Sequence, residues 1–154
     1  MSVPATIPLA DLASHVGRSF GPSDWFTIDQ DLVNRFADLT HDHQFIHVDV
    51  EAAKRTQLGG TIAHGFLTLS LQSHLAGAVM PRVEGATMVF NYGFDKLRFV
   101  SFVRVGARIR AAIVLKGVEP KGRGQTLVTY GLTVEIEGES RPAVVADWLS
   151  LVIA

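Results

Sequence analysis

The sequence contains no cysteine, which excludes disulfide bonds, thiolate nucleophiles and cysteine-ligated metal sites. It is also poor in charge, because only 19% of its 154 residues are charged and the net charge is −1. A balance so close to neutrality provides no basic field that would hold a nucleic acid or an anionic membrane. We therefore expect neither partner, and any anionic ligand must be bound by a few local cations.

The N-terminus lacks the basic stretch and apolar run of a secretory signal, so we expect a cytoplasmic protein. Residues 61–80 carry no formal charge, and about 20 apolar residues are what a membrane-spanning helix needs. This segment, however, holds polar side chains that lipid would solvate poorly: His64, Thr68, Ser70, Gln72, Ser73 and His74. We predict a long helix over about 62–79 that is covered by protein, with His74 as a hydrogen-bonded core residue.

Apolar periodicity predicts two helices before this long one. The first is amphipathic and is expected to end near Thr40, with Thr27 and Gln30 in capping-box spacing at its start. Asp49 is a suitable N-cap for a short second helix over 50–56. The polar residues between the two helices are therefore expected to form a loop.

The second half of the chain is rich in Val, Ile, Leu, Thr and aromatic residues, and apolar and polar residues alternate most clearly over 128–136. This pattern predicts strands over 87–97, 107–118, 125–137 and 142–153. Glycine-containing segments at 121–124 and 138–140 are typical of hairpin turns, so the sheet should be antiparallel. Helices followed by strands indicate an α+β fold in one domain over residues 1–154, with the uncharged helix covering the apolar face of the sheet.

The segment His41–His47, with the sequence HDHQFIH, is the strongest functional signal. It places Asp42 and His47 five residues apart after an amphipathic helix, and such a pair can hold one water molecule and move its protons. Gly65 follows His64 at the start of the uncharged segment, where a backbone N–H can stabilise developing negative charge. Together these features indicate the addition of water to a substrate.

Residues 42–47, with the sequence DHQFIH, resemble the Asp-x-Asn-Pro-x-His element of the MaoC-like, R-specific enoyl-CoA hydratases, also called hydratase 2. They are closer still to a NodN-like subgroup that carries Asp-His-Gln-Trp-Ile-His. The resemblance continues through residues 61–68 (TIAHGFLT), 91–93 (NYG) and 98–106. Because these pieces occur in the correct order over most of the chain, it is identified as a member of this family, whose hot-dog fold wraps an antiparallel sheet around one long helix.

The resemblance implies that Asp42 and His47 bind the catalytic water and that the Gly65 amide donates to the thioester oxygen. The implied reaction is reversible syn addition of water to trans-2-enoyl-CoA, giving (R)-3-hydroxyacyl-CoA. A homodimer is implied as well, with two sheets joined edge to edge and CoA near the interface. Hydration transfers no electrons, so we expect no dissociable cofactor and no metal ion. Gln44 and Phe45 depart from the family's Asn and Pro, and packing of Phe45 is one way to hold the loop without the rigid proline.

Several alternatives are compatible with the same residues. A hot-dog thioesterase would direct the water at the carbonyl carbon, and a non-catalytic acyl-CoA-binding protein would bind without turnover. Taken alone, Asp42 suits a turn, His64 suits a helix cap and Gly65 suits close packing. A metal site built from His41, His43, His47, Asp42 and His64 would lack a familiar zinc spacing. Three cations near the expected pocket are candidates for the CoA phosphates, although each also suits a solvated face: Lys96, Arg98 and Arg104.

Overall fold

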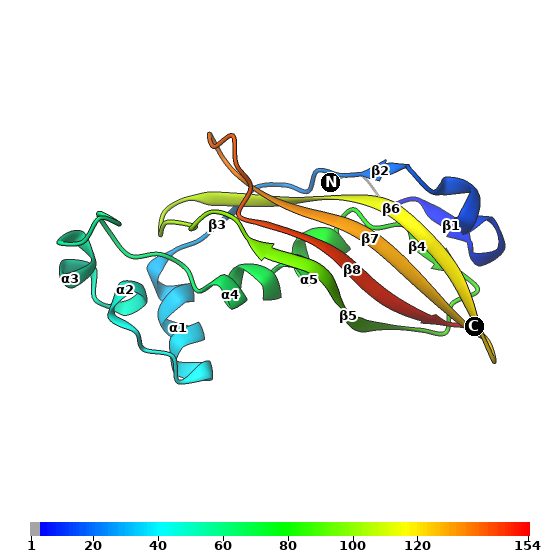
Figure 1. Ribbon diagram of the computed structural model, residues 1–154, viewed down its shortest axis with the longest axis horizontal. Coiled ribbons are helices and arrows are strands. Elements are labelled where there is room, and N and C mark those ends of the chain that lie inside the picture. The colour runs from blue at the N-terminus through cyan, green and yellow to red at the C-terminus, as the bar shows by residue number, and fades with distance from the viewer. Residues whose placement is uncertain (1–3) are drawn as a thin grey trace.

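Four long strands form the main sheet in the computed structural model, which describes residues 4–154 (Figure 1). They are β5 (Met88–Phe99), β6 (Arg108–Gly122), β7 (Gln125–Ile136) and β8 (Val144–Ile153). All four predicted strands are therefore present, and the largest difference is that β6 continues to Gly122. β7 alternates most clearly between inward apolar and outward side chains, which makes it readable without tertiary information, whereas most residues of β5 are exposed.

The strand order is β2-β6-β7-β8-β5, and β6–β7 and β7–β8 are antiparallel hairpins as predicted. β5 pairs with the last strand, β8, so the chain crosses from one side of the sheet to the other between β5 and β6. Two short strands, β2 (Ser19–Phe20) and β3 (Phe26–Thr27), pair with the outer edge of β6. Within residues 4–154, β5 has a neighbour only on its β8 side, so its other edge is open.

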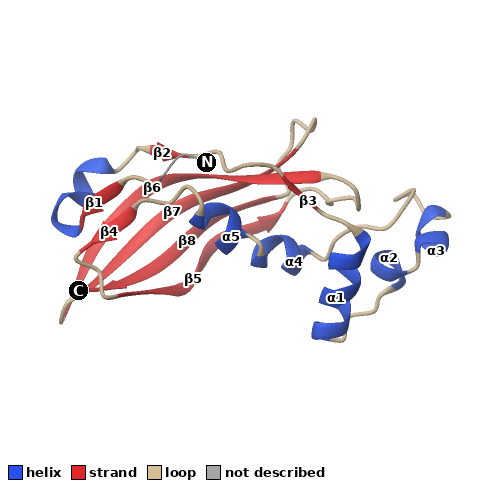
Figure 2. Ribbon diagram, turned by 180° about the vertical axis from the view of Figure 1, so that it is seen from behind, coloured by secondary structure: helices blue, strands red, loops and turns tan. Residues whose placement is uncertain are grey.

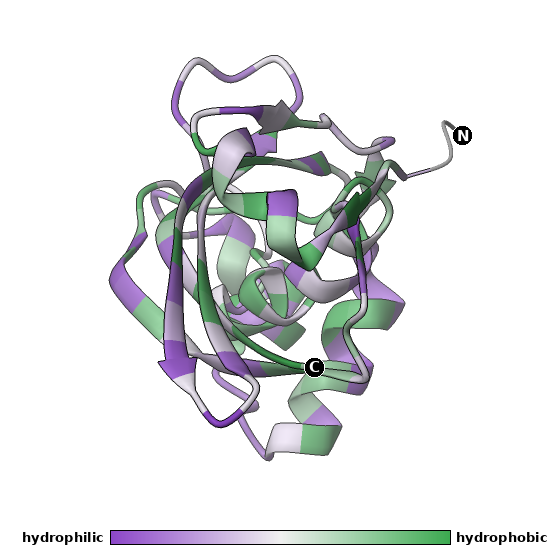
Figure 3. Ribbon diagram, turned by 90° about the vertical axis from the view of Figure 1, so that its right-hand side faces the viewer, coloured by the Kyte–Doolittle hydropathy of each residue, from purple (hydrophilic) through white to green (hydrophobic). Residues whose placement is uncertain are grey.

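The core lies between the concave face of the sheet and two helices, α4 (Gly65–Ser70) and α5 (Gln72–Gly77) (Figure 2). Viewed end-on, the strands curve partly around these helices (Figure 3). Alternate residues of β7 fill the concave face and are almost completely buried: Val128, Tyr130, Leu132, Val134 and Ile136. This is the apolar face that the alternation predicts.

The long helix expected over 62–79 is shorter and interrupted. It begins only at Gly65, because the backbone before it pairs with residues 103–105: Ala63 N donates to Val103 O at 2.8 Å and Val105 N donates to Thr61 O at 3.0 Å. The break falls beside Ser70, whose hydroxyl donates to Phe66 O at 2.7 Å, a back-bond that bends helices.

The helical hydrogen bonds continue across this break, so α4 and α5 act as one rod. The buried residues of α5 are Gln72, Leu75 and Ala76, which leaves His74 exposed on the opposite side. The prediction of a core role for His74 is therefore wrong. Within residues 4–154, no helix unites the length and hydrophobicity that crossing a bilayer demands.

Three helices lie beyond one end of the sheet: α1 (Gln30–Thr40), α2 (Phe45–Val48) and α3 (Val50–Lys54) (Figure 1). The predicted end of the first helix at Thr40 and the predicted cap Asp49 are both confirmed, since the Asp49 carboxylate accepts from Ala52 N at 2.8 Å. The expected Thr27–Gln30 capping box is wrong, because Asp29 caps α1 by accepting from Leu32 N at 2.8 Å.

The opposite end of the sheet carries the N-terminal segment. β1 (Thr6–Pro8) pairs in parallel with β4 (Arg82–Glu84), and a 3-10 helix, η1 (Leu9–His15), lies between β1 and β2. The expectation about a secretory signal was read partly from residues 1–3, which lie outside the described residues. The chain thus forms a curved sheet, a helical rod in its concavity and a helical overhang at one end.

Candidate active site

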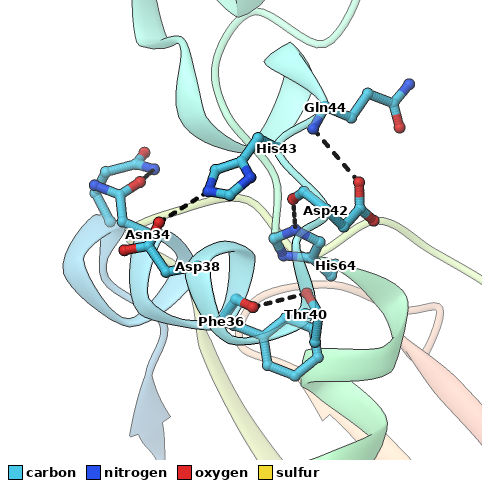
Figure 4. A network of polar contacts seen from close by, with 9 residues as sticks. Asn34, Phe36, Asp38, Thr40, Asp42, His43, Gln44 and His64 are labelled. Atoms are coloured by element: carbon cyan, nitrogen blue, oxygen red, sulfur yellow. Dashed lines mark hydrogen bonds and ion pairs between the residues drawn. The ribbon is translucent and has the colours of Figure 1, made fainter.

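The loop between α1 and α2 carries Asp42 and is held by hydrogen bonds. His41 ends α1 in the left-handed conformation, with a φ of 59°. The ring Nε2 of His43 lies 2.8 Å from Asp38 Oδ1, and Gln44 N donates to Asp42 Oδ1 at 3.4 Å (Figure 4). His43 therefore orders the loop, and the Asp42 carboxylate is turned toward the start of α2.

His47 lies on α2 and is almost completely buried, with 7% of its surface exposed. Its Nδ1 is 2.8 Å from the carbonyl oxygen of Ile62. A carbonyl can only accept, so Nδ1 carries the proton and the neutral ring keeps Nε2 as a hydrogen-bond acceptor. This is the tautomer that a general base at Nε2 requires.

Gln30 supports His47 through hydrogen bonds, and this role could not be read from the sequence. Its Nε2 donates to the carbonyl of His47 at 2.7 Å, and its Oε1 accepts from the hydroxyl of Thr61 at 2.6 Å. The side chain thus ties α1 to α2 and to the segment that precedes α4. Its sequence position, three residues after Thr27, indicates only a helix cap.

Burial is the main reason that the pKa of His47 lies below its ordinary value of 6.5. The neighbouring His64 lowers this pKa further, whereas the hydrogen bond to Ile62 and the negative charge of Asp42 raise it. The net effect favours the neutral imidazole at pH 7 and leaves Nε2 free to accept a proton.

The structure brings Asp42 and His47 together. A carboxylate oxygen of Asp42, a ring nitrogen of His47 and a ring nitrogen of His64 all lie within 4.8 Å of one another. A spacing of this order allows one water molecule to hydrogen-bond to a carboxylate and an imidazole at the same time. Asp42 approaches from the exposed loop, whereas both histidines are buried.

A cavity of about 250 Å³ opens beside His47 and the start of α4. Gly65 is the first residue of α4, so its N–H has no partner four residues earlier in the helix. The walls of the cavity are mostly apolar, and they include Ile46, His47, Ile62, Gly65, Thr68, Phe99, Phe102 and Val144. His47 and the Gly65 backbone therefore face one apolar space, with Asp42 next to His47.

Phe99 covers Gly65 from the end of β5. A Cβ atom added to Gly65 would lie 3.1 Å from Phe99 Cδ1, so the ring packs directly on the glycine. Phe66 meets the same ring edge to face, with centroids 5.6 Å apart. Phe102 also lines the cavity and is 70% exposed, so aromatic rings surround its opening.

The loop departs from the expectation in one respect. Phe45 leaves 46% of its surface exposed, so its packing does not replace the rigidity of a proline. Hydrogen bonds from Gln30, His43 and His64 hold the loop and α2 instead. Among the three candidate cations, Lys96 is paired with Asp147 at 3.5 Å on the outer face of the sheet.

Asp42, His47 and His64 supply donor atoms that a divalent ion could also use. The His64 Nε2, however, already donates to the Asp42 carbonyl at 2.9 Å. The two imidazole rings are stacked, with centroids 3.7 Å apart and planes 24° from parallel. Stacked rings direct their nitrogens along nearly parallel planes, whereas the ligands of one ion must converge on it. The arrangement therefore suits a hydrogen-bonded water better than a metal ion.

A larger cavity of about 540 Å³ lies near the other end of α5, between that helix and the segment around β3. Its lining includes Asp24, Trp25, His74 and Arg82. Its lining residues include neither His47 nor Gly65. Chemistry rather than size therefore identifies the smaller cavity as the candidate active site.

Comparisons with known proteins give the relatives of this chain. A family model described as the MaoC like domain matches residues 11–136. Nodulation protein N from Rhizobium leguminosarum bv. viciae is 48% identical over 147 residues, covering 95% of this chain and 91% of that protein. The 3-hydroxyacyl-thioester dehydratase Z of Mycobacterium tuberculosis is 50% identical over 139 residues, covering 90% of this chain and 91% of that protein.

Solved structures share the fold at lower identity. A monoamine oxidase regulatory protein from Archaeoglobus fulgidus superposes with a TM-score of 0.80 at 24% identity, covering 99% of this chain and 98% of that one. The R-hydratase PhaJ1 from Pseudomonas aeruginosa superposes with a TM-score of 0.69 at 24% identity, covering 97% of this chain and 86% of that one. The predicted α+β hot-dog fold, with a helical overhang, is confirmed by these likenesses.

Proposed function

Because the chain belongs to the MaoC-like domain family, we propose that it is an R-specific enoyl-CoA hydratase, a hydro-lyase that adds water reversibly to trans-2-enoyl-CoA. Addition is syn, and the product is (R)-3-hydroxyacyl-CoA. The relative named as a 3-hydroxyacyl-thioester dehydratase supports this chemistry, since dehydration is the same reaction in reverse.

The reacting water is held between the Asp42 carboxylate and Nε2 of His47. Both groups accept hydrogen bonds, so together they orient the two protons of the water and leave an oxygen lone pair for the β-carbon of the thioester. The oxygen adds to the β-carbon, and one proton of the water passes through the pair to the α-carbon on the same face. The Asp42–His47 pair returns to its starting protonation state, so atoms and charge balance over one turnover.

The Gly65 N–H stabilises the negative charge that develops on the thioester oxygen. The stabilising group is this single amide and not a helix dipole, since α4 has only six residues. Gly65 and His47 line the same apolar cavity, from which most water is displaced when substrate enters. A hydrogen bond to a charged oxygen is stronger in such surroundings than in water.

The observation that supports this proposal best is the convergence of an Asp42 oxygen and a His47 nitrogen within 4.8 Å beside a cavity that His47 and Gly65 line. The test is hydration of crotonyl-CoA, followed as loss of enoyl absorbance with chiral analysis of the product. We expect Asp42→Asn and His47→Gln each to lower kcat by about 10²- to 10⁴-fold, because each removes one half of the acid–base pair.

The control is Asp31→Asn, which alters an exposed carboxylate of α1 that forms an ion pair with Arg35 at 3.0 Å on the helix surface. It should keep kcat within about threefold of wild type, since general acid–base chemistry is untouched. Unchanged hydration in Asp42→Asn or His47→Gln would refute the assignment. Release of free CoA, measured with a thiol reagent, would instead identify a thioesterase, and binding without either product would identify an acyl-CoA-binding protein.

A further inference from the structure

His64 contacts both members of the proposed catalytic pair. It is 97% buried, and its Nε2 donates to the main-chain carbonyl of Asp42 at 2.9 Å (Figure 4). Its ring stacks on that of His47, with centroids 3.7 Å apart and an interplanar angle of 24°. Phe36 of α1 packs against the same ring, with centroids 5.0 Å apart. His64 therefore packs against α1 through Phe36, and it contacts Asp42 and His47 directly.

His64 uses only one of its two ring nitrogens in a hydrogen bond within residues 4–154. Since Nε2 must carry the proton to donate to a carbonyl, the neutral ring leaves Nδ1 as an acceptor. Within residues 4–154, this buried Nδ1 has no hydrogen-bond partner. A buried acceptor without a partner opposes folding, so a phenylalanine would fill the same space with less loss of solvation. Stability alone does not account for an imidazole here, whereas its donor to Asp42 does.

We propose that His64 is a positioning residue of the hydration reaction: its ring fixes the plane of the His47 imidazole, and its Nε2–H fixes the Asp42 backbone. This inference rests on the proposed hydratase function. Asp42 lies in an exposed loop, and the bond from His64 ties its backbone to the segment that carries Gly65. One side chain thus sets the distance between the carboxylate, the imidazole and the amide.

The expected consequence is a loss of turnover rather than of substrate binding. A displacement of about 1 Å in a catalytic group can lower the rate about 100-fold. His64 is not among the residues that line the cavity, so its replacement leaves the substrate contacts in place. We therefore expect kcat to fall while KM changes little.

Two substitutions separate the ring from the donor. His64→Phe keeps an aromatic ring against His47 and Phe36 but cannot donate to Asp42. His64→Gln keeps an N–H donor of similar reach but removes the stacked ring. We expect His64→Phe to lower kcat for crotonyl-CoA about 100-fold with KM within threefold, and His64→Gln to recover about tenfold of that loss. The matched control is His74→Phe, on the exposed side of α5, which should keep wild-type kcat and KM.

The outcomes distinguish this inference from the function on which it rests. If the wild-type protein does not hydrate enoyl-CoA, the proposed function fails and the role of His64 fails with it. If the wild type is active and a folded His64→Phe protein keeps its kcat, only the positioning role is overturned. Circular dichroism establishes folding. If His64→Phe does not fold, His64→Gln decides the matter: kcat at least fivefold below wild type at unchanged KM supports the role, and wild-type kcat overturns it.

Discussion

His47 is buried, which favours a neutral ring, and a hydrogen bond fixes the tautomer in which this ring can accept a proton. Its Nδ1 is committed to Ile62, and burial lowers its pKa below the ordinary 6.5. A lowered pKa means that the folded protein binds this proton less readily than the unfolded chain does. Stability should therefore rise with pH through this range and decline as the solution is acidified below about 6.5.

The same shift predicts the pH dependence of the activity. Hydration requires a neutral His47, so the acidic limb of kcat/KM should have an apparent pKa below 6.5, and activity should increase as pH rises through it. The measurement is initial rate at low crotonyl-CoA concentration between pH 4.5 and 8, with the buffers overlapping. An acidic limb above 6.5 would contradict a His47 that burial keeps neutral.

Gly65 is constrained by Phe99 rather than by its own backbone. An alanine Cβ would lie 3.1 Å from Phe99 Cδ1, so the ring must shift although the amide remains. We expect Gly65→Ala to lower kcat/KM about tenfold with no loss of thermal stability, since alanine is the better helix former. The double variant with Phe99→Leu should recover part of the loss. Equal activity of the single and double variants would show that the contact with Phe99 is unimportant.

Among secondary-structure elements, α1 supports the site although it carries none of the proposed catalytic residues, because Gln30 and Phe36 both project from it. Gln30 holds the backbone of His47, and Phe36 packs on His64. The helix itself begins at an Asp29 carboxylate that accepts from Leu32 N at 2.8 Å. The N-terminal cap of α1 therefore supports the residues behind the catalytic pair.

Removal of this cap should be measurable. We expect Asp29→Ala to lower the free energy of unfolding by about 1 kcal/mol, the usual value of an N-cap carboxylate. The matched control is Asp31→Ala in the same helical turn, whose side chain makes a solvent-exposed ion pair with Arg35 at 3.0 Å. That change should cost at most a few tenths of a kcal/mol. Urea unfolding of the two variants compares them, and equal midpoints would contradict the capping role.

The elements also show where local pattern is a sufficient guide. The alternation in β7 and the Asp49 cap of α3 depend on neighbours within a few residues, and the sequence predicts both. It also predicts the helix α1, although not its Asp29 cap. The segment over 62–79 is uniformly uncharged, so nothing in its pattern shows that residues 61–63 pair with 103–105 instead of entering the helix. The start at Gly65 is decided by those distant partners.

For the molecule as a whole, the open edge of β5 is the most consequential feature. Four large apolar side chains near the start of β5 are about half exposed or more: Met88, Val89, Phe90 and Tyr92. An open strand edge with exposed apolar groups invites pairing with another strand. We propose that two copies pair through β5 in a homodimer with twofold symmetry, which is also the arrangement that the family resemblance implies.

Light scattering tests this proposal at micromolar concentration. The wild type should have twice the 16.7 kDa mass of one chain, and the variant with both Phe90→Glu and Tyr92→Glu should be a monomer, since like charges would face each other across the pairing. The control is Leu39→Glu on α1, at a side chain that is 79% exposed and distant from β5 in the sequence. A fully active wild-type monomer would reject the dimer.

The sequence was sufficient to predict the order of the secondary-structure elements and to propose Asp42, His47 and Gly65 as the candidate site. Asp42 and His47 lie in one short segment and each of the four strands has its own local composition, so these features can be read from residues that are neighbours along the chain. Tertiary structure alone decided that β5 lies beside β8, that Gln30 reaches His47 and Thr61, and that His64 stacks on His47. The physical reason is that these contacts join residues 17 or more positions apart, whose meeting depends on how the whole chain packs and not on any local period.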